Sequence, residues 1–313
     1  MSKTSNGRLS AARIMARLFV ILASLCLAAL MAFHQQIPDI AGLGLVIDNL
    51  APWLGLGIPI LLLLAIGCGG RGTFITLLVP VIVWGVLFGP AAVPAQRVES
   101  PEALSVATQN VHQDAVQSAQ TLADSGAQVI TLQELGSGQI EQVTKALRKS
   151  HPYFYSVSTV GVWSKYRLSN PQPLDLGLGW NRALRIDVEA DGGPVRLYAV
   201  HAASARPMAH SERDAMLAAL GTYLANDGSP RIIAAGDFNA ANTDRHFEPV
   251  ARQLDQVPYT AWGLPMTWPR TPFPMLSIDN VLTRGASEAS MERIAAGDSD
   301  HYALHATVLL TGS

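Results

Sequence analysis

The sequence predicts an α+β protein: a four-layer αββα sandwich preceded by three transmembrane helices. Three observations support this prediction. The first 96 residues contain long uncharged apolar stretches, the remainder alternates short strand-like and helix-like segments, and the strand-like segments outnumber the helix-like ones. Because many strand-like segments come in adjacent pairs, two packed sheets with helices outside are favoured over a doubly wound parallel sheet.

The apolar stretches of residues 1–96 are long enough to cross a bilayer. The uncharged runs are Leu18–Phe33, Leu50–Gly70 and Gly72–Gln96. A helix of about 20 residues, with a rise of about 1.5 Å per residue, crosses a hydrocarbon core of about 30 Å. We therefore predict three transmembrane helices, at about residues 14–34, 50–70 and 72–94. A cleaved signal peptide is the alternative for the first stretch, and a buried hairpin of a soluble protein is the alternative for the other two.

The positions of the basic residues predict the orientation in the membrane. Four of them lie in the N-terminal flank, before the first uncharged run, namely Lys3, Arg8, Arg13 and Arg17. The loop 34–49 has none, and Arg71 lies between the second and third spans. Loops rich in lysine and arginine face the cytoplasm. We therefore expect a multi-pass plasma-membrane protein with a cytoplasmic N-terminus, a membrane domain over 1–96 and an extracytoplasmic domain over 97–313.

The net charge of residues 97–313 limits the classes of molecule that they are expected to bind. Residues 1–96 hold five of the 22 Lys and Arg residues and two of the 24 Asp and Glu residues, which leaves 17 basic and 22 acidic residues and a net charge of −5. Proteins that grip long nucleic acids usually present a basic surface, so nucleic acid is not favoured as a partner. Both cysteines, Cys26 and Cys68, lie in the apolar part, so no disulfide is predicted within 97–313.

The pattern of residues 97–313 predicts strands, helices and one long loop. Strands are expected at 104–109, 129–132, 161–164, 183–188, 195–200, 231–235, 278–282 and 302–310, and helices at 115–125, 139–149 and 212–224. Residues 258–274 contain five prolines and two tryptophans and are expected to form a structured loop, which at this length is often functional.

Polar residues recur where the predicted strands end or begin. They are Asn110, Glu134, His201, Asp237, Asn239, Asp279, Asp300 and His301. Each has an ordinary structural explanation by itself, as a turn former, a capping group or a buried histidine. The ordered set is much less probable by chance. Strand ends converge on one rim of a sandwich, so these side chains are expected to meet.

The ordered set resembles the endonuclease/exonuclease/phosphatase superfamily, whose members include DNase I-like nucleases, sphingomyelinases and inositol-phosphate phosphatases. The resemblance extends over about 97–313 and is carried by Gln133-Glu134, the GDFN sequence at 236–239 and the SDH sequence at 299–301. The chain departs from the family pattern at Lys165, where arginine is commoner, and at Asn280, where histidine or tyrosine is common. The resemblance implies a metal-dependent phosphatase or phosphodiesterase.

The metal expected from this chemistry is Mg²⁺, with Mn²⁺ as a possible substitute. Mg²⁺ takes oxygen ligands, usually one or two carboxylates with water and substrate. Glu134 is the first predicted ligand, and Asn110 is expected nearby as a ligand or a phosphate contact. Asp300 is also a candidate for contact with the metal.

The resemblance implies roles for the remaining polar residues. His301 takes a proton from the attacking water and is oriented by Asp300, while His201 is held by Asp279 and donates a hydrogen bond to a phosphoryl oxygen. Two further site residues, Asp237 and Asn239, position water and phosphate. The sequence leaves open whether His301 or Asp237 is the general base.

Two loops bear on the substrate. Arg206 lies five residues after His201 and is a candidate for gripping a second phosphate, or a solvated loop arginine. The aromatic residues Trp262, Trp268 and Phe273 either lie at the level of lipid headgroups or pack within their loop.

The predicted spans, the HAASARP sequence at 201–207 and the TWP sequence at 267–269 resemble the VanJ-type teicoplanin-resistance membrane proteins. That resemblance implies a lipid-linked phosphate substrate at the bilayer surface, undecaprenyl pyrophosphate, and a role in recycling the cell-wall carrier lipid. The alternatives are an extracytoplasmic nuclease, a phospholipid phosphodiesterase of the sphingomyelinase type, and a scaffold without activity.

Overall fold

The computed structural model describes residues 3–311, with side chains described from Ala11 onward, and it divides into two compact units between Ala91 and Ala92. This division lies five residues before the predicted boundary at 96/97. The side chains of Lys3 and Arg8, which contribute to the predicted orientation, fall outside the described part. The two units are described separately below.

The N-terminal unit is helical. Its elements are α1 (Lys3–Ala32), η1 (His34–Gln36), α2 (Leu43–Leu50), η2 (Ala51–Leu56), α3 (Gly57–Cys68) and α4 (Arg71–Leu87), and α5 (Gly89–Ala92) crosses the division. Two segments are apolar and long enough to cross a membrane: Ala11–Ala32, and the run Leu43–Cys68 formed by α2, η2 and α3. The second begins earlier than predicted because α2 and η2 continue directly into α3.

The prediction of three spans is corrected to two candidates. The third apolar helix, α4, has 17 residues, so at about 1.5 Å per residue it is shorter than the roughly 30 Å hydrocarbon core. Its start is set by Gly69 and Gly70, both at positive φ, which end the preceding helix. Its end comes at Leu87, before Pro90 within the short helix α5. The uncharged run at 72–96 is therefore longer than the helix that it forms.

The C-terminal unit contains two six-stranded sheets. The first has the order β11-β12-β1-β2-β4-β3, and its strands are β1 (Leu104–Asn110), β2 (Val129–Gln133), β3 (Tyr153–Val157), β4 (Val160–Ser164), β11 (Ala286–Ile294) and β12 (Ala303–Leu310). The second has the order β5-β6-β7-β8-β10-β9, and its strands are β5 (Leu168–Leu174), β6 (Ala183–Ala190), β7 (Gly193–His201), β8 (Ile232–Asp237), β9 (Asp255–Gln256) and β10 (Asp279–Arg284).

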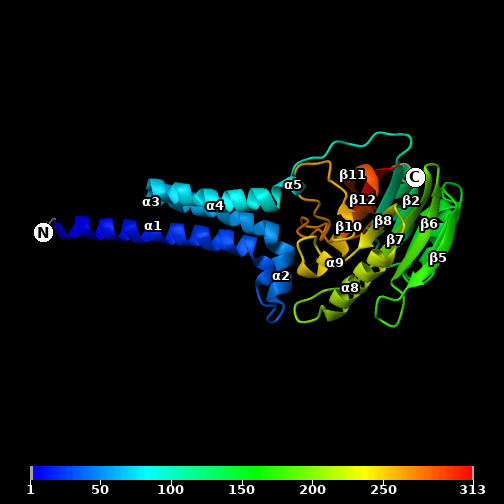
Figure 1. Ribbon diagram of the computed structural model, residues 1–313, viewed down its shortest axis with the longest axis horizontal. Helices are drawn as coiled ribbons and strands as arrows, with labels where there is room; N and C mark the ends of the chain where they lie inside the picture. The colour runs from blue at the N-terminus through cyan, green and yellow to red at the C-terminus, as the bar shows by residue number, and fades with distance from the viewer. Residues whose placement is uncertain (1–2, 312–313) are drawn as a thin grey trace. The chain divides into compact units, whose positions relative to one another are not determined.

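Helices cover the outer faces of the two sheets. The helices α6 (Ala115–Asp124) and α7 (Gln139–Leu147) pack on the first sheet, and α8 (Ser211–Asn226) and α9 (Glu248–Ala251) on the second. Figure 1 shows α8 lying along the sheet that contains β7 and β8. A third cluster of buried aliphatic side chains fills the space between the sheets. The predicted α+β class with two packed sheets is confirmed.

Alternating side chains build these layers. In β6, Leu184, Ile186 and Val188 face the core between the sheets, and burying each side chain contributes about 1.5–3 kcal/mol. The helix α6, which covers the first sheet, is capped at its N-terminus by Asp114. The Asp114 carboxylate accepts a 2.9 Å hydrogen bond from the backbone N–H of Gln117. The helix ends before Gly126, which is at positive φ.

Four strands were not predicted from the sequence: β3, β5, β9 and β11. Edge position explains them, because β3, β5, β9 and β11 are the outermost strands of the two sheets. Such strands need no continuous apolar pattern, and β5 even contains Pro171 and Pro173, which edge strands tolerate. The predicted loop over 258–274 is present, and its Trp268 forms an isolated bridge with Leu276.

Strand direction gathers the polar residues at one rim. The pairs β1/β2 and β7/β8 are parallel, so their C-terminal ends lie together. The strands β10 and β12 run antiparallel to β8 and β1, so their N-terminal ends lie at the same rim. Register places Asp237 opposite both His201 and Asp279.

Candidate active site

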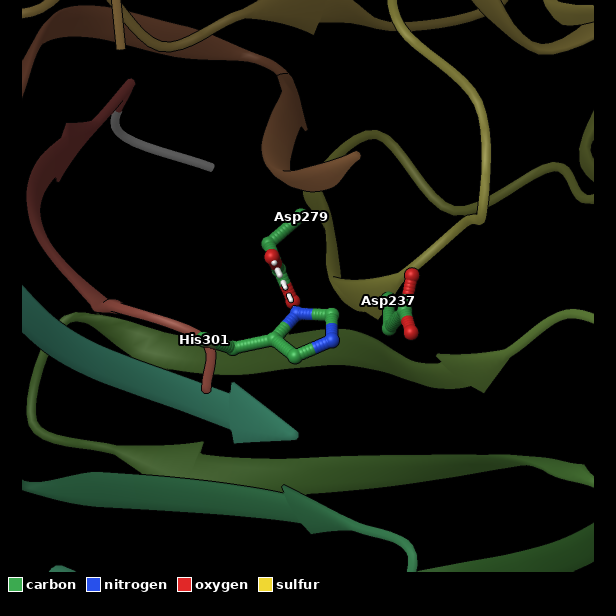
Figure 2. Close-up of side chains that lie close together, drawn as sticks. All are labelled: Asp237, Asp279 and His301. Carbon is green, nitrogen blue, oxygen red and sulfur yellow. Dashed lines mark hydrogen bonds and ion pairs between the residues drawn. The ribbon is translucent and has the colours of Figure 1, made fainter. Parts of the chain in front are cut away.

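The centre of the rim is a buried group of Asp237, Asp279 and His301. One ligand atom of each lies within 4.8 Å of the others, and the three residues are at most 6% exposed. His301 Nδ1 lies 2.8 Å from Asp279 Oδ2, and Figure 2 shows the imidazole between the two carboxylates. The dashed line in that view marks the His301–Asp279 pair.

The environment makes His301 a cation near neutral pH. Burial lowers the pKa of His301, but the charge and hydrogen bond of Asp279, with the charges of Asp237 and Asp300, outweigh burial and raise the pKa to about 10. Burial raises the pKa of Asp237, and the negative charge of Asp279 raises it further. A protonated His301 can donate hydrogen bonds but cannot accept a proton. Asp237, whose pKa is also raised, binds a proton more readily than an ordinary aspartate.

The structure corrects two predicted pairings. Asp279 holds His301 rather than His201, because Asp279 opens β10 directly beside Asp237 and faces the buried centre. Asp300 does not orient His301 by a hydrogen bond: it is exposed, and its Oδ2 accepts a 2.9 Å hydrogen bond from Trp268 Nε1. It still acts on His301 through its charge.

A hydroxyl fixes the turn that presents His301. Ser299 Oγ donates to the backbone carbonyl of Asn110 at 2.6 Å and accepts from the backbone N–H of His301 at 3.0 Å. The SDH sequence therefore joins the end of β1 to the beginning of β12. The tryptophan ring of Trp268 lies 6.4 Å from the His301 ring, centroid to centroid, and covers that side.

Asn110 and Asn239 hold the carboxylate of Asp237. Asn110 Nδ2 donates to Asp237 Oδ2 at 3.0 Å, and the backbone N–H of Asn239 donates to Oδ1 at 2.8 Å. The side chain of Asn239 also donates to Oδ2 at 3.2 Å. Asn239 itself has φ +49°, a conformation that asparagine tolerates better than most residues. These donors fix the direction in which Asp237 faces the rim.

The GDFN sequence requires glycine at its first position. Gly236 has φ +151°, and a Cβ there would lie 1.9 Å from the backbone carbonyl oxygen of Val200. Only glycine permits this close approach of β8 to β7. The approach places Asp237 opposite His201 at the ends of the two strands.

Glu134 and His201 form the outer part of the site. Glu134 Oε1 lies 3.4 Å from His201 Nε2, and the Glu134 side chain is 46% exposed. The hydrogen bond from His201 lowers the pKa of Glu134 to about 2 in spite of burial, with further contributions from Asn110 and the charge of His301. Glu134 has φ +62°, and such backbone strain concentrates at functional sites.

The donor set around Glu134 fits Mg²⁺. The carboxylate is ionised and half exposed, and Asn110 is close enough to share a hydrogen bond with it, so oxygen ligands and space for water coincide. Distances alone would also allow a metal between Asp237, Asp279 and His301. We favour Glu134 with Asn110, because Mg²⁺ takes oxygen ligands and usually keeps several waters, and the Glu134 side chain is 46% exposed whereas Asp237, Asp279 and His301 are buried.

Other residues named from the sequence lie at different depths. Arg206 is exposed, and its backbone pairs with Ala209 across a tight turn. Asn280 is fully buried behind the site, where its Nδ2 donates to the carbonyl of Ala240 at 3.3 Å. The predicted site residues from β1, β2, β7, β8, β10 and β12 therefore meet at one rim, and Arg206 stays on the surface.

Two residues of the rim, Arg182 and Trp180, were not predicted from the sequence. Arg182 directly precedes β6, and its Nη2 lies 2.6 Å from Nε2 and 2.9 Å from Nδ1 of His201. Trp180 lies against this arginine, with 5.2 Å between the guanidinium carbon and the ring centroid. The only signal in the sequence was a charged residue next to a strand that begins with Ala183, which is too common a pattern to be informative.

This fold and rim assign the chain to a class of hydrolases that act on phosphate esters. A family model described as "Endonuclease/Exonuclease/phosphatase family" matches residues 107–301, and the chain belongs to that family. No protein of curated function matches the chain in a sequence comparison.

Solved structures share the fold. Sphingomyelinase C from Streptomyces griseocarneus is similar at 16% identity and a TM-score of 0.52, covering 66% of this chain and 99% of that protein. A beta toxin mutant from Staphylococcus aureus with bound magnesium ions is similar at 14% identity and a TM-score of 0.53, covering 65% and 99%. Humanized D. rerio TDP2 is similar at 19% identity and a TM-score of 0.52, covering 66% and 99%.

Proposed function

We propose that this protein is a metal-dependent phosphohydrolase in which Asp237 is the general base and the His301 cation binds a phosphoryl oxygen. The observation that carries the proposal is the geometry of one buried group: Asp279 accepts the 2.8 Å hydrogen bond from His301 and lies opposite Asp237, so that the pKa of both His301 and Asp237 is raised, which holds His301 protonated and increases the affinity of Asp237 for a proton. A carboxylate whose pKa is raised from its ordinary value toward the working pH is better suited to accept a proton from water. His301 then serves as a donor rather than as the base.

The reaction follows from these roles. A water oxygen forms a bond to phosphorus while the bond from phosphorus to the leaving oxygen breaks, and the leaving oxygen departs with the electron pair. The proton of the water passes to the Asp237 carboxylate. His301, with Asn110 and Asn239 nearby, stabilises the negative charge on the phosphoryl oxygens.

Glu134 and Asn110 would hold the metal ion, which we propose to be Mg²⁺, with Mn²⁺ as a substitute. When bound, the ion neutralises charge on the phosphate and favours ionisation of water. A magnesium-bound relative of the same fold supports this choice of metal.

The proposed substrate is a lipid pyrophosphate such as undecaprenyl pyrophosphate, hydrolysed at the outer surface of the plasma membrane. Two apolar helices long enough to span a bilayer support attachment to a membrane. Large apolar side chains on loops of the catalytic unit are also exposed, with Trp262 at 80%, Met208 at 79% and Phe273 at 54%. A net charge of −5 over 97–313 disfavours long nucleic acids. A cytoplasmic N-terminus and an outer catalytic unit remain part of this proposal.

A second candidate is a phospholipid phosphodiesterase. The fold similarity to sphingomyelinase C and to a beta toxin favours it. The deciding experiment incubates the detergent-solubilised full chain and Mg²⁺ with polyprenyl pyrophosphate, sphingomyelin and plasmid DNA in parallel. Phosphate release from the pyrophosphate alone supports the leading proposal. Cleavage of sphingomyelin alone supports the second candidate, and cleavage of DNA alone contradicts both.

A further inference from the structure

The rim contains a guanidinium group that the roles described so far do not use. The side chain of Arg182 lies between the ring of Trp180, at 5.2 Å from its centroid, and the ring nitrogens of His201, at 2.6 and 2.9 Å. The backbone carbonyl of Arg182 also accepts a 3.0 Å hydrogen bond from the His201 N–H. The position of Arg182 is therefore fixed both by its place at the start of β6 and by its contacts with His201 at the end of β7.

The charge of Arg182 is desolvated and faces the catalytic carboxylates. Burial lowers the pKa of Arg182, and the negative charges of Glu134, Asp237 and Glu212 partly offset that effect. A guanidinium group still stays protonated under all physiological conditions. Arg182 is thus a permanent positive charge within electrostatic reach of the proposed metal ligand and of the proposed base.

Part of the hydrogen-bonding capacity of Arg182 is unused. Its Nε is buried and has no hydrogen-bond partner among the described residues. A buried donor without a partner costs free energy, so such a group in a functional rim points to a ligand that would approach it. The fork of a guanidinium matches the spacing of two phosphate oxygens, and its packing on Trp180 keeps it ordered before binding.

Phosphate needs such a partner here. The rim contains the carboxylates of Glu134, Asp237 and Asp279, which repel an anionic substrate. The His301 cation and the proposed Mg²⁺ ion would offset part of this charge, and Arg182 adds a further fixed positive charge. A fixed guanidinium aimed at the developing charge of the phosphoryl group lowers the barrier at little cost in reorganisation.

We propose that Arg182 is a catalytic residue that binds the non-bridging oxygens of the substrate phosphate, held in place by Trp180 and His201. This inference rests on the proposed function of the same site. It assigns phosphate recognition to Arg182 at the rim instead of to the exposed Arg206.

The first test measures the binding of inorganic phosphate to the detergent-solubilised full chain with Mg²⁺ by isothermal titration calorimetry, beside turnover of polyprenyl pyrophosphate. Arg182→Gln should weaken phosphate binding at least tenfold and lower kcat/KM by roughly 10²–10³-fold, the loss typical of one oxyanion donor. Arg148→Gln, at an exposed arginine on the end of α7, is the matched control and should change neither quantity.

The second test separates phosphate contact from a merely structural role. Arg182→Ala should regain part of its activity when free guanidinium is added at millimolar concentration, because the ion can occupy the space beside Trp180. Arg182→Lys should keep the melting temperature but not the full activity, since a lysine lacks the planar fork. A loss that guanidinium does not restore, in a protein with wild-type melting, would overturn the inference.

The outcomes also separate this inference from the proposed function. If wild type hydrolyses substrate and Arg182→Gln binds phosphate and turns over equally well, the inference fails and the proposed function stands. If Arg206→Gln loses phosphate binding and Arg182→Gln does not, the inference also fails. If phosphate binding depends on Arg182 but wild type hydrolyses no phosphate compound, the phosphate-binding role of Arg182 stands, and its catalytic role fails together with the proposed function.

Discussion

Asp279 Oδ2 accepts a hydrogen bond from His301 Nδ1 at 2.8 Å, although the two residues are 22 positions apart and Asp279 belongs to one sheet while His301 lies in the turn that leads into the other. Asp279 opens β10 of one sheet, and His301 lies two residues before the start of β12 in the other. The pair therefore bridges the two layers of the sandwich at the rim. It also sets the ionisation of the site, because Asp279 is the principal group that raises the pKa of His301 to about 10.

Replacing Asp279 with asparagine should lower the pH at which activity is lost on the alkaline side. The pKa of His301 is raised, so its protonated form persists through neutral pH and disappears as the pH rises through about 10. Without the Asp279 charge, the alkaline limb of the pH profile of kcat/KM should shift to lower pH, toward the ordinary histidine pKa of about 6.5. A pH–rate profile checks this shift.

Asp300→Asn is the matched comparison for Asp279→Asn. Asp300 acts on His301 through charge alone, and its effect comes after those of Asp279 and Asp237. It should move the alkaline limb by less. An equal or larger shift for Asp300→Asn would contradict the pairing seen in the structure.

Glu134→Gln should remove most of the activation by Mg²⁺. Glu134 is ionised above about pH 2 and is half exposed, so it is available to a hydrated ion throughout the neutral range. An amide keeps a ligand oxygen but loses the charge, and Mg²⁺ strongly prefers carboxylates. A Mg²⁺ titration of phosphate release should need at least tenfold more metal, whereas Glu141→Gln, at an exposed acid on α7, should leave the titration unchanged.

The sequence was sufficient to predict two packed sheets and most of the site, because strand ends are local features. An apolar run followed by a polar residue placed Asn110, His201 and Asp237 at strand ends, and the ordered set of such residues made them site candidates. The pairings were not local. Which carboxylate holds His301 depends on β10 lying beside β8, and no short-range pattern contains that register.

Two further features were not predicted correctly because they do not depend on local sequence: Arg182 in the rim and the number of candidate membrane spans. Arg182 has no motif around it, and its role follows only from the meeting of β6 with β7. Three candidate spans were predicted instead of two because the uncharged run at 72–96 does not form one helix: α4 ends at Leu87. Helix ends depend on backbone geometry, which hydropathy does not report.

Gly236→Ala should destabilise the catalytic unit and abolish activity. The new Cβ would lie 1.9 Å from the carbonyl oxygen of Val200, a backbone atom that cannot move without separating β7 from β8. We expect poor expression or a melting temperature lowered by at least several degrees. Gly228→Ala is the control, since its Cβ would meet nothing within 4 Å, and it should melt like wild type. Wild-type stability of Gly236→Ala would show that the strands are not paired as described.

Arg213→Met should lower the free energy of unfolding by about 3–5 kcal/mol, because it breaks the buried ion pair between Arg213 and Asp244. Arg213 is fully buried, its Nη1 lies 2.8 Å from Asp244 Oδ2, and the same nitrogen donates to the carbonyl of Asn239 at 2.9 Å. Thermal unfolding followed by circular dichroism would measure the loss. Activity should fall as well, since Asn239 holds Asp237.

An exposed ion pair serves as the control for the buried pair of Arg213 and Asp244. Arg252 and Glu248 pair on the surface, with side chains 70% and 47% exposed, so Arg252→Met should cost no more than about 1 kcal/mol. Equal losses for the two variants would mean that Arg213 is not the buried link between α8 and the loop after β8.

The most direct test of the central claim is phosphate release by the purified full chain and by Asp237→Asn, with Mg²⁺ and a panel of a lipid pyrophosphate, sphingomyelin and a nucleotide. The general-base role of Asp237 predicts turnover of at least one substrate by wild type and a rate lower by roughly 10²–10⁴-fold in the variant, with unchanged melting. Equal rates for the two proteins would contradict the assignment of this rim as the catalytic centre.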